Sequence, residues 1–181
     1  MFLHVVGARP NFPKVKPLMV EMSKREIKHK LLHTGQHYDY LMSKVFFNEL
    51  DIPEPDYHLN GYIGKTHAEQ TGNIMIQLES IFKSLKLTAV VVYGDINSTV
   101  SAALAASKLH IPVIHIESGC RSFDKKMPEE INRIVVDHIS DYLFCTDSHA
   151  VKNLKQEGIN KNVYLTGNLM VDTLRSLNLV D

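Results

Sequence analysis

Charged and polar side chains that could do chemistry follow apolar runs at several points in this chain. Asp95 and Glu117 each come directly after such a run, Arg9 follows the first run, and Gln36 with His37 follows the second. Two carboxylates in one partly closed cleft have their pKa values pushed apart, which yields an acid and a base. A guanidinium group nearby can hold an anion. These residue types predict proton-transfer chemistry beside an anion-binding group.

The elements that must position these residues alternate between strand-like and helix-like patterns. Six apolar runs lie within residues 3–8, 31–35, 89–94, 113–116, 142–145 and 163–166. Helical spacing of apolar residues appears over 12–22, 66–86, 98–104, 131–138, 151–154 and 170–177. Alternating strands and helices predict right-handed crossovers and a Rossmann-like, doubly wound parallel sheet of the α/β class. The strand ends then share one edge, where ligands bind in such folds.

The turn after the first strand reads Gly-Ala-Arg-Pro-Asn-Phe-Pro-Lys over residues 7–14, which is neither GxGxxG nor a P-loop. Pro10 or Pro13 suits the first turn of a helix. The helix N-terminus, Arg9 and Lys14 would then surround a space that fits a diphosphate or another anion. The alternative is a helix start that carries two solvated cations.

Each carboxylate also has a structural interpretation. Asn97 and Ser98 are better placed than Asp95 to cap the helix that follows, which leaves Asp95 available. Glu117 alternatively forms a structural ion pair with Arg121. The Glu129–Glu130 pair begins a helix, where acidic residues often serve only the helix dipole.

Other candidates in the sequence have simpler interpretations. Asp137 and Asp141 are interpreted as surface charges, and His138 is expected to pack on an apolar helical stripe. We find no His/Cys/Asp cluster with metal-ligand spacing and no nucleophile elbow, so we predict no metal and no cofactor.

The composition limits the class of protein. With 181 residues and 44% hydrophobic content, we expect one domain over 1–181. Lys and Arg number 20, as do Asp and Glu, so the zero net charge argues against nucleic acid and anionic membrane as partners. Two cysteines without a pattern, and no signal peptide or membrane-spanning run, favour a reducing, cytoplasmic setting.

Taken together, the motifs resemble the non-hydrolysing UDP-N-acetylglucosamine 2-epimerases. The matching segments are GARPNFPKVKP (7–17), TGQHYD (34–39), YGDINST (93–99), HIESGCRSFDKKMPEEINR (115–133) and LTGNLMVDTL (165–174). The resemblance implies the first domain of a glycosyltransferase B-type fold, with the second domain, which carries the rest of the cleft, absent. It also implies UDP-N-acetylglucosamine as ligand and a homodimer.

The resemblance implies a reaction and roles for individual residues. UDP is eliminated to a 2-acetamidoglucal and added back after inversion at C2, giving UDP-N-acetylmannosamine. Asp95, Glu117 and Glu129 match the acidic catalytic residues, and Glu129 is chosen over Glu130 as the first Glu after the proline. Arg9 and Lys14 match residues near the nucleotide phosphates. Gln36 and His37 match a loop of an allosteric substrate site.

Departures from the family pattern leave alternatives open. Segment 61–66 and the residues after His37 lack the Gln and Arg of the bacterial allosteric site, and Ser118 and Cys120 replace Ala and Leu. We expect little or no turnover by this chain alone. The alternatives are a hydrolysing epimerase that releases N-acetylmannosamine and UDP, a non-catalytic nucleotide-sugar-binding remnant, and a subunit of a split enzyme.

Overall fold

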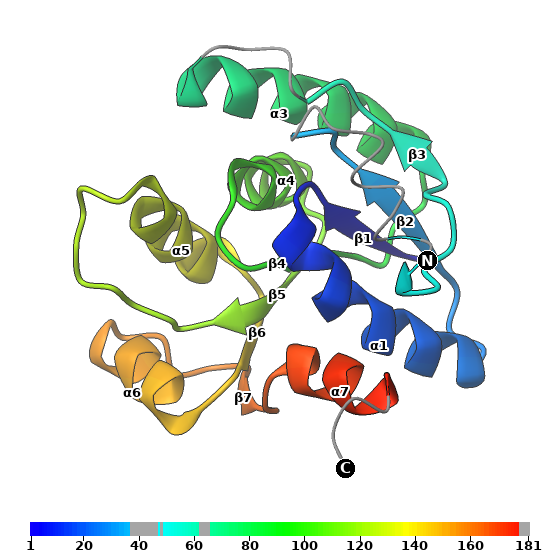
Figure 1. Cartoon of the computed structure of the whole chain (residues 1–181). Helices are drawn as coiled ribbons and strands as arrows, with labels where there is room; N and C mark the ends of the chain where they lie inside the picture. The colour runs from blue at the N-terminus through cyan, green and yellow to red at the C-terminus, as the bar shows by residue number, and fades with distance from the viewer. Residues whose placement is uncertain (37–46, 48, 62–65, 178–181) are drawn as a thin grey trace.

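The computed structural model describes residues 1–36, 47, 49–61 and 66–177 of the chain (Figure 1). Seven parallel strands form one sheet in the order β3-β2-β1-β4-β5-β6-β7. The strands are β1 (Phe2–Val6), β2 (His29–His33), β3 (Tyr57–His58), β4 (Ala89–Tyr93), β5 (Val113–Ser118), β6 (Tyr142–Cys145) and β7 (Val163–Leu165). The prediction of a Rossmann-like parallel sheet is confirmed.

The helices of the described residues connect these strands. They are the short 3-10 helix η1 (Arg9–Asn11), α1 (Phe12–Lys24), α3 (His67–Ser84), α4 (Asn97–Lys108), α5 (Pro128–Ile139), α6 (Ser148–Gln156) and α7 (Leu169–Ser176). α3 begins with a capping box, in which Thr66 and Glu69 bond to each other's backbone N–H groups. Each predicted helical segment therefore corresponds to a helix.

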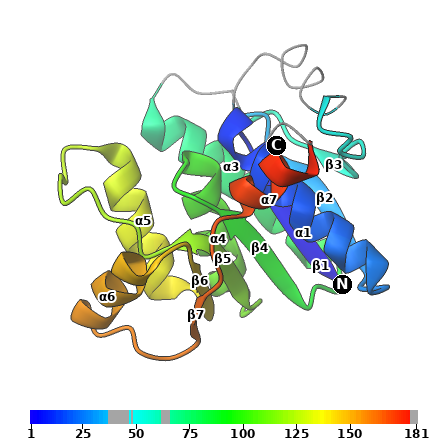
Figure 2. The same cartoon turned by 60° about the horizontal axis from the view of Figure 1, so that its bottom comes forward.

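Helices cover both faces of the sheet. α3, α4 and α5 lie on one face, and α1 and α7 lie side by side on the other (Figures 1 and 2). Alternate residues of β4 serve the two layers: Val90 and Val92 join the core under α3 and α4, whereas Val91 and Tyr93 join the core under α1. Burial on both faces explains why the strands are almost continuously apolar.

Two details extend the sequence-based description. Tyr57 and His58, which lie in none of the six predicted strand runs, form the short edge strand β3, which pairs with β2. None of the helices in the described part of the chain is long and apolar enough to cross a membrane.

Candidate functional site

The carboxyl ends of β1, β4 and β5 meet where the strand order reverses direction. Gly7 is the residue directly after β1. A Cβ atom on it would lie 2.1 Å from Ser98 Oγ and 2.4 Å from Thr34 Oγ1. Only glycine therefore allows the start of α4 to approach the turn after β1 this closely. The resulting crevice is the place where open α/β sheets bind ligands.

Glu117 is brought to this crevice by an unusual backbone conformation. The register between β5 and β6 shifts between Ile116 and Ser118, and Glu117 itself has a φ angle of 70°. A non-glycine residue in the left-handed region costs of order 1 kcal/mol or more, and such strain is concentrated at functional sites. The carboxylate forms an ion pair with the ammonium group of Lys14 from the first turn of α1.

Asp95 is held by a different cation. Arg133 of α5 contacts Asp95 Oδ2 at 2.5 Å and Glu130 Oε2 at 2.9 Å, so one guanidinium group bridges two carboxylates. Glu130 is buried and also accepts the backbone N–H groups of Ser122 and Phe123. Burial opposes ionisation, but these hydrogen bonds and Arg133 lower the pKa of Glu130 below its usual value.

Glu130, rather than Glu129, is therefore connected to Asp95 in the structure. Glu129 is half-exposed, and its carboxylate makes no hydrogen bond or ion pair with any described residue. The role assigned to Glu129 rests on the resemblance alone and stays a prediction. Sequence reasoning passed over Arg133, although its spacing of three from Glu130 on one helix was a usable signal.

The other predicted binding residues have distinct surroundings. Arg9 lies exposed on η1 and lines an open groove of about 700 Å³ between the start of α1 and α7. Gln36 Oε1 accepts hydrogen bonds from the backbone N–H and hydroxyl of Ser98, at 2.8 and 2.6 Å, so it holds the first turn of α4. His37 lies outside the described residues.

One interpretation of the side chains that follow Asp95 is wrong. Asn97 and Ser98 do not cap α4 with their side chains; Ile96 occupies the N-cap position. Asn97 instead bonds to Gln70 and to Asn132 of α5. This arrangement ties three helices together below Asp95, and the amide of Asn132 also donates to the Asp95 carbonyl at 2.8 Å.

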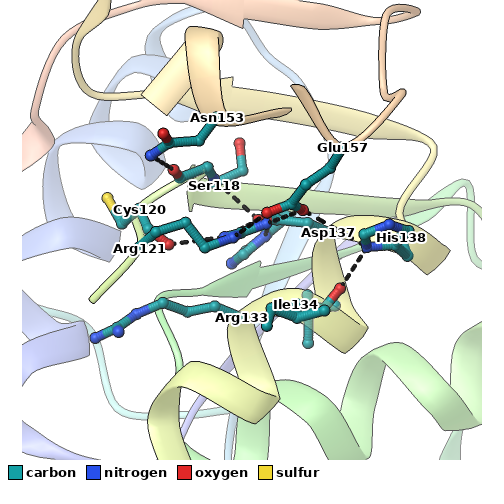
Figure 3. Close-up of polar contacts among 12 residues, drawn as sticks. Ser118, Cys120, Arg121, Arg133, Ile134, Asp137, His138, Asn153 and Glu157 are labelled. Atoms are coloured by element: carbon teal, nitrogen blue, oxygen red, sulfur yellow. Dashed lines mark hydrogen bonds and ion pairs between the residues drawn. The ribbon is translucent and has the colours of Figure 1, made fainter. Parts of the chain in front are cut away.

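The prediction of which side chains of α5 are buried is also wrong for His138 and Asp137. His138 is exposed rather than packed, and Asp137 is buried rather than on the surface. Arg121 pairs with Asp137 and Glu157, not with Glu117 (Figure 3). The buried side chains of α5 are Val136, which joins the apolar core, and three polar residues. Glu130 and Asp137 accept backbone N–H groups of the loop after β5, and Asn132 bonds to the Asp95 carbonyl and to Asn97.

A pocket of about 280 Å³ extends from the Lys14–Glu117 pair along the sheet face beside α1. Thr146, Thr166 and Asn168 add hydrogen-bonding groups to its lining. Apolar side chains complete it, including Leu18, Met22, Ile116 and Phe144. The arrangement offers a cation and a carboxylate beside an enclosed apolar space, which suits a polar ligand with a small apolar group.

The fold and the position of these groups define a Rossmann-like α/β domain that resembles the first domain of a glycosyltransferase B-type fold. The sequence model of the UDP-N-acetylglucosamine 2-epimerase family matches residues 20–180. The chain therefore belongs to the UDP-N-acetylglucosamine 2-epimerase family.

Individual relatives agree with this assignment. A UDP-N-acetylglucosamine 2-epimerase homolog of Methanococcus maripaludis is 49% identical over 98% of this chain and 49% of its own length. A UDP-2,3-diacetamido-2,3-dideoxy-D-glucuronate 2-epimerase of Pseudomonas aeruginosa is 46% identical over 94% of this chain and 49% of its own. The crystal structure of Methanocaldococcus jannaschii UDP-GlcNAc 2-epimerase in complex with UDP-GlcNAc and UDP superposes with a TM-score of 0.92, at 45% identity, over 97% of this chain and 49% of that one. The chain thus spans about half the length of these relatives.

Proposed function

We propose that this chain supplies the acid–base half of a non-hydrolysing UDP-N-acetylglucosamine 2-epimerase site. The observation that carries the proposal is the convergence of Glu117 with Lys14, and of Asp95 with Arg133 and Glu130, at the carboxyl edge of the sheet. Family membership supports the same ligand class, since the M. jannaschii relative is described in complex with UDP-GlcNAc and UDP.

The proposed reaction needs both kinds of group. Elimination breaks the bond from C1 to the diphosphate oxygen and removes the proton from C2, giving UDP and a 2-acetamidoglucal. Re-addition of UDP to C1, with a proton delivered to the opposite face of C2, gives the manno epimer. A carboxylate must accept one proton and a carboxylic acid must deliver another, and we assign these roles among Asp95, Glu117 and the Glu129–Glu130 pair. Lys14 and Arg9 stabilise the negative charge on the leaving diphosphate.

The matched relatives are twice as long, so we propose that the remainder of the cleft comes from a second half. The test is a chimera in which this chain replaces the matched half of the M. jannaschii relative. Proton NMR in D2O with UDP-N-acetylglucosamine should show deuterium at C2 and the manno epimer for the chimera, and little or none for this chain alone. A folded chimera that produces neither would overturn the proposal.

The same spectra separate the alternatives. Free N-acetylmannosamine with UDP would indicate a hydrolysing enzyme instead. Ligand-observed binding of UDP-N-acetylglucosamine to the chain, without turnover in the chimera, would indicate a non-catalytic binding domain. Because one relative is named for a diacetamido-glucuronate substrate, the UDP sugar of that type is assayed in parallel.

A further inference from the structure

We propose that Asp137 is a positioning residue that sets the separation between the turn bearing Asp95 and the turn bearing Glu117. The inference rests on the proposed function, because it concerns the same two carboxylates. Asp137 belongs to α5 and contacts neither of them. It acts on the backbone beside each one, through His115 and Gly119.

The first connection runs to the Asp95 turn. Asp137 Oδ1 lies 2.7 Å from His115 Nδ1, and His115 Nε2 lies 2.8 Å from the carbonyl oxygen of Gly94, the residue before Asp95. Both side chains are fully buried, at 0% exposure. The Gly94 carbonyl only accepts hydrogen bonds, so Nε2 donates to it, and the contacts at both ring nitrogens fix the imidazole ring in one orientation.

The second connection runs to the Glu117 turn. Asp137 Oδ2 accepts the backbone N–H of Gly119 at 3.0 Å, and the amide of Asn153 donates to the carbonyl of the same glycine at 3.0 Å. Gly119 has a φ angle of 79°, and a Cβ there would lie 2.4 Å from the Ala150 carbonyl oxygen. Gly119, two residues after the strained Glu117, is therefore held at both its N–H group and its carbonyl group.

The carboxylate itself is kept charged and in place by Arg121. One guanidinium nitrogen bonds Asp137 Oδ2 and the Cys120 carbonyl, both at 2.7 Å, while Nε and Nη2 bond the two oxygens of Glu157 at 2.7 Å (Figure 3). The Arg121 side chain is 1% exposed. The Arg121 guanidinium group therefore lies between the carboxylates of Asp137 and Glu157 and compensates their negative charge.

The buried polar contacts of Asp137 lie outside the apolar cores of the domain. These contacts end on Gly94 and Gly119, which flank the two carboxylates. Acid–base groups need their separation held to within about 0.5 Å. The contacts of Asp137 with His115, Gly119 and Arg121 are therefore placed where they can hold Asp95 and Glu117 at the separation that proton transfer requires.

The test uses Asp137→Asn, which keeps the shape of the side chain but places an amide N–H2 opposite a donor. In this chain, we expect hydrogen exchange at the Gly119 amide to become at least 10-fold faster, while amides in α3 remain protected. In the chimera, we expect kcat to fall at least 10-fold, with KM changing less than about 3-fold, because substrate contacts are intact. Unchanged Gly119 exchange would overturn the proposal.

Two controls separate positioning from loss of stability. Leu78→Ala destabilises the core under α3, far from the contacts of Asp137, and should leave kcat at the assay temperature within about 3-fold. An equal fall in kcat in Leu78→Ala and Asp137→Asn would mean that Asp137 is only structural.

If Asp137→Asn does not fold, Arg121→Lys is used instead, because it removes the guanidinium contacts with both Asp137 and Glu157. It should also speed exchange at the Gly119 amide and lower kcat, but by smaller factors than Asp137→Asn. A wild-type chimera without activity would refute the proposed function, and the Gly119 exchange would still decide whether Asp137 holds this turn.

Discussion

The ammonium group of Lys14 and the carboxylate of Glu117 join helix α1 to strand β5 across 103 positions of sequence. Their side chains are 10% and 27% exposed, so solvent screens this pair less than it screens an ion pair on the surface. The pair also lies beside Gly94, where a Cβ atom would come 3.4 Å from Lys14 Nζ and 3.5 Å from Glu117 Oε2. The cation therefore occupies the crevice next to the turn that carries Asp95.

This contact predicts a measurable energetic coupling. Lys14→Met and Glu117→Gln should each lower the free energy of unfolding, and the double variant should lose about 1 kcal/mol less than the sum of the two. Urea unfolding of the four proteins measures the difference. The exposed Arg25–Glu21 pair is the control, and its coupling should stay below about 0.5 kcal/mol. Additive effects of Lys14→Met and Glu117→Gln would contradict the prediction.

The two adjacent glutamates at the start of α5 form a matched pair of variants. Glu130→Gln should cost about 1–3 kcal/mol of stability, because the buried side chain then has only one oxygen to accept the N–H groups of Ser122 and Phe123. Glu129→Gln should change stability by less than about 0.5 kcal/mol, since Glu129 is half-exposed.

Turnover of the chimera then decides which glutamate serves the reaction. The connection of Glu130 through Arg133 to Asp95 predicts the larger loss of kcat for Glu130→Gln. A loss confined to Glu129→Gln would assign the role to Glu129, as the resemblance implied.

Replacing Gly7 by alanine should lower the stability of the protein, whereas replacing Gly72 by alanine should raise it. Gly7→Ala places a methyl group 2.1 Å from Ser98 Oγ, so α4 must shift, at a cost of about 1–3 kcal/mol. Gly72 lies within α3 with nothing within 4 Å of an added Cβ, so Gly72→Ala should stabilise by about 0.5–1 kcal/mol. Thermal unfolding of both variants checks the signs. A Gly7→Ala variant as stable as the wild type would mean that the contact with Ser98 is not tight.

Buried His4 predicts a loss of stability in acid. Burial, assisted by the nearby His29, lowers the pKa of His4 from 6.5 to about 3. Between these values the unfolded chain binds a proton that the folded protein excludes, so stability falls as pH drops below 6.5. The contribution is about 1.4 kcal/mol per pH unit and is constant above 6.5.

Chemical unfolding at several pH values between 4 and 7 measures this slope. His4→Gln removes the titrating ring and should flatten the slope, whereas the exposed His149→Gln should leave it unchanged. Equal slopes for wild type and His4→Gln would show that other groups dominate the acid response.

Patterns along the sequence were enough to predict the sheet and the edge at which the candidate site residues lie. The apolar runs ending at Val6, Tyr93 and Ile116 can be buried on both faces only in a parallel sheet covered by helices, so the residues after them must share one edge. Asp95 and Glu117 were located in this way, and the catalytic roles proposed for them rest on the resemblance to the family. Periodicity of this kind is a local property, which is why it can be read from the chain.

Partners of the charged side chains were decided by the tertiary structure. Lys14 meets Glu117 only because α1 lies beside the end of β5, and Arg121 meets Asp137 only because α5 lies beside the loop after β5. Periodicity predicted an apolar inward face for α5, and Val136 does join the core. Glu130 and Asp137 are buried as well, because they accept backbone N–H groups and pair with the guanidinium groups of Arg133 and Arg121. A buried charge is stable only where specific partners compensate it, and those partners come from segments distant in sequence.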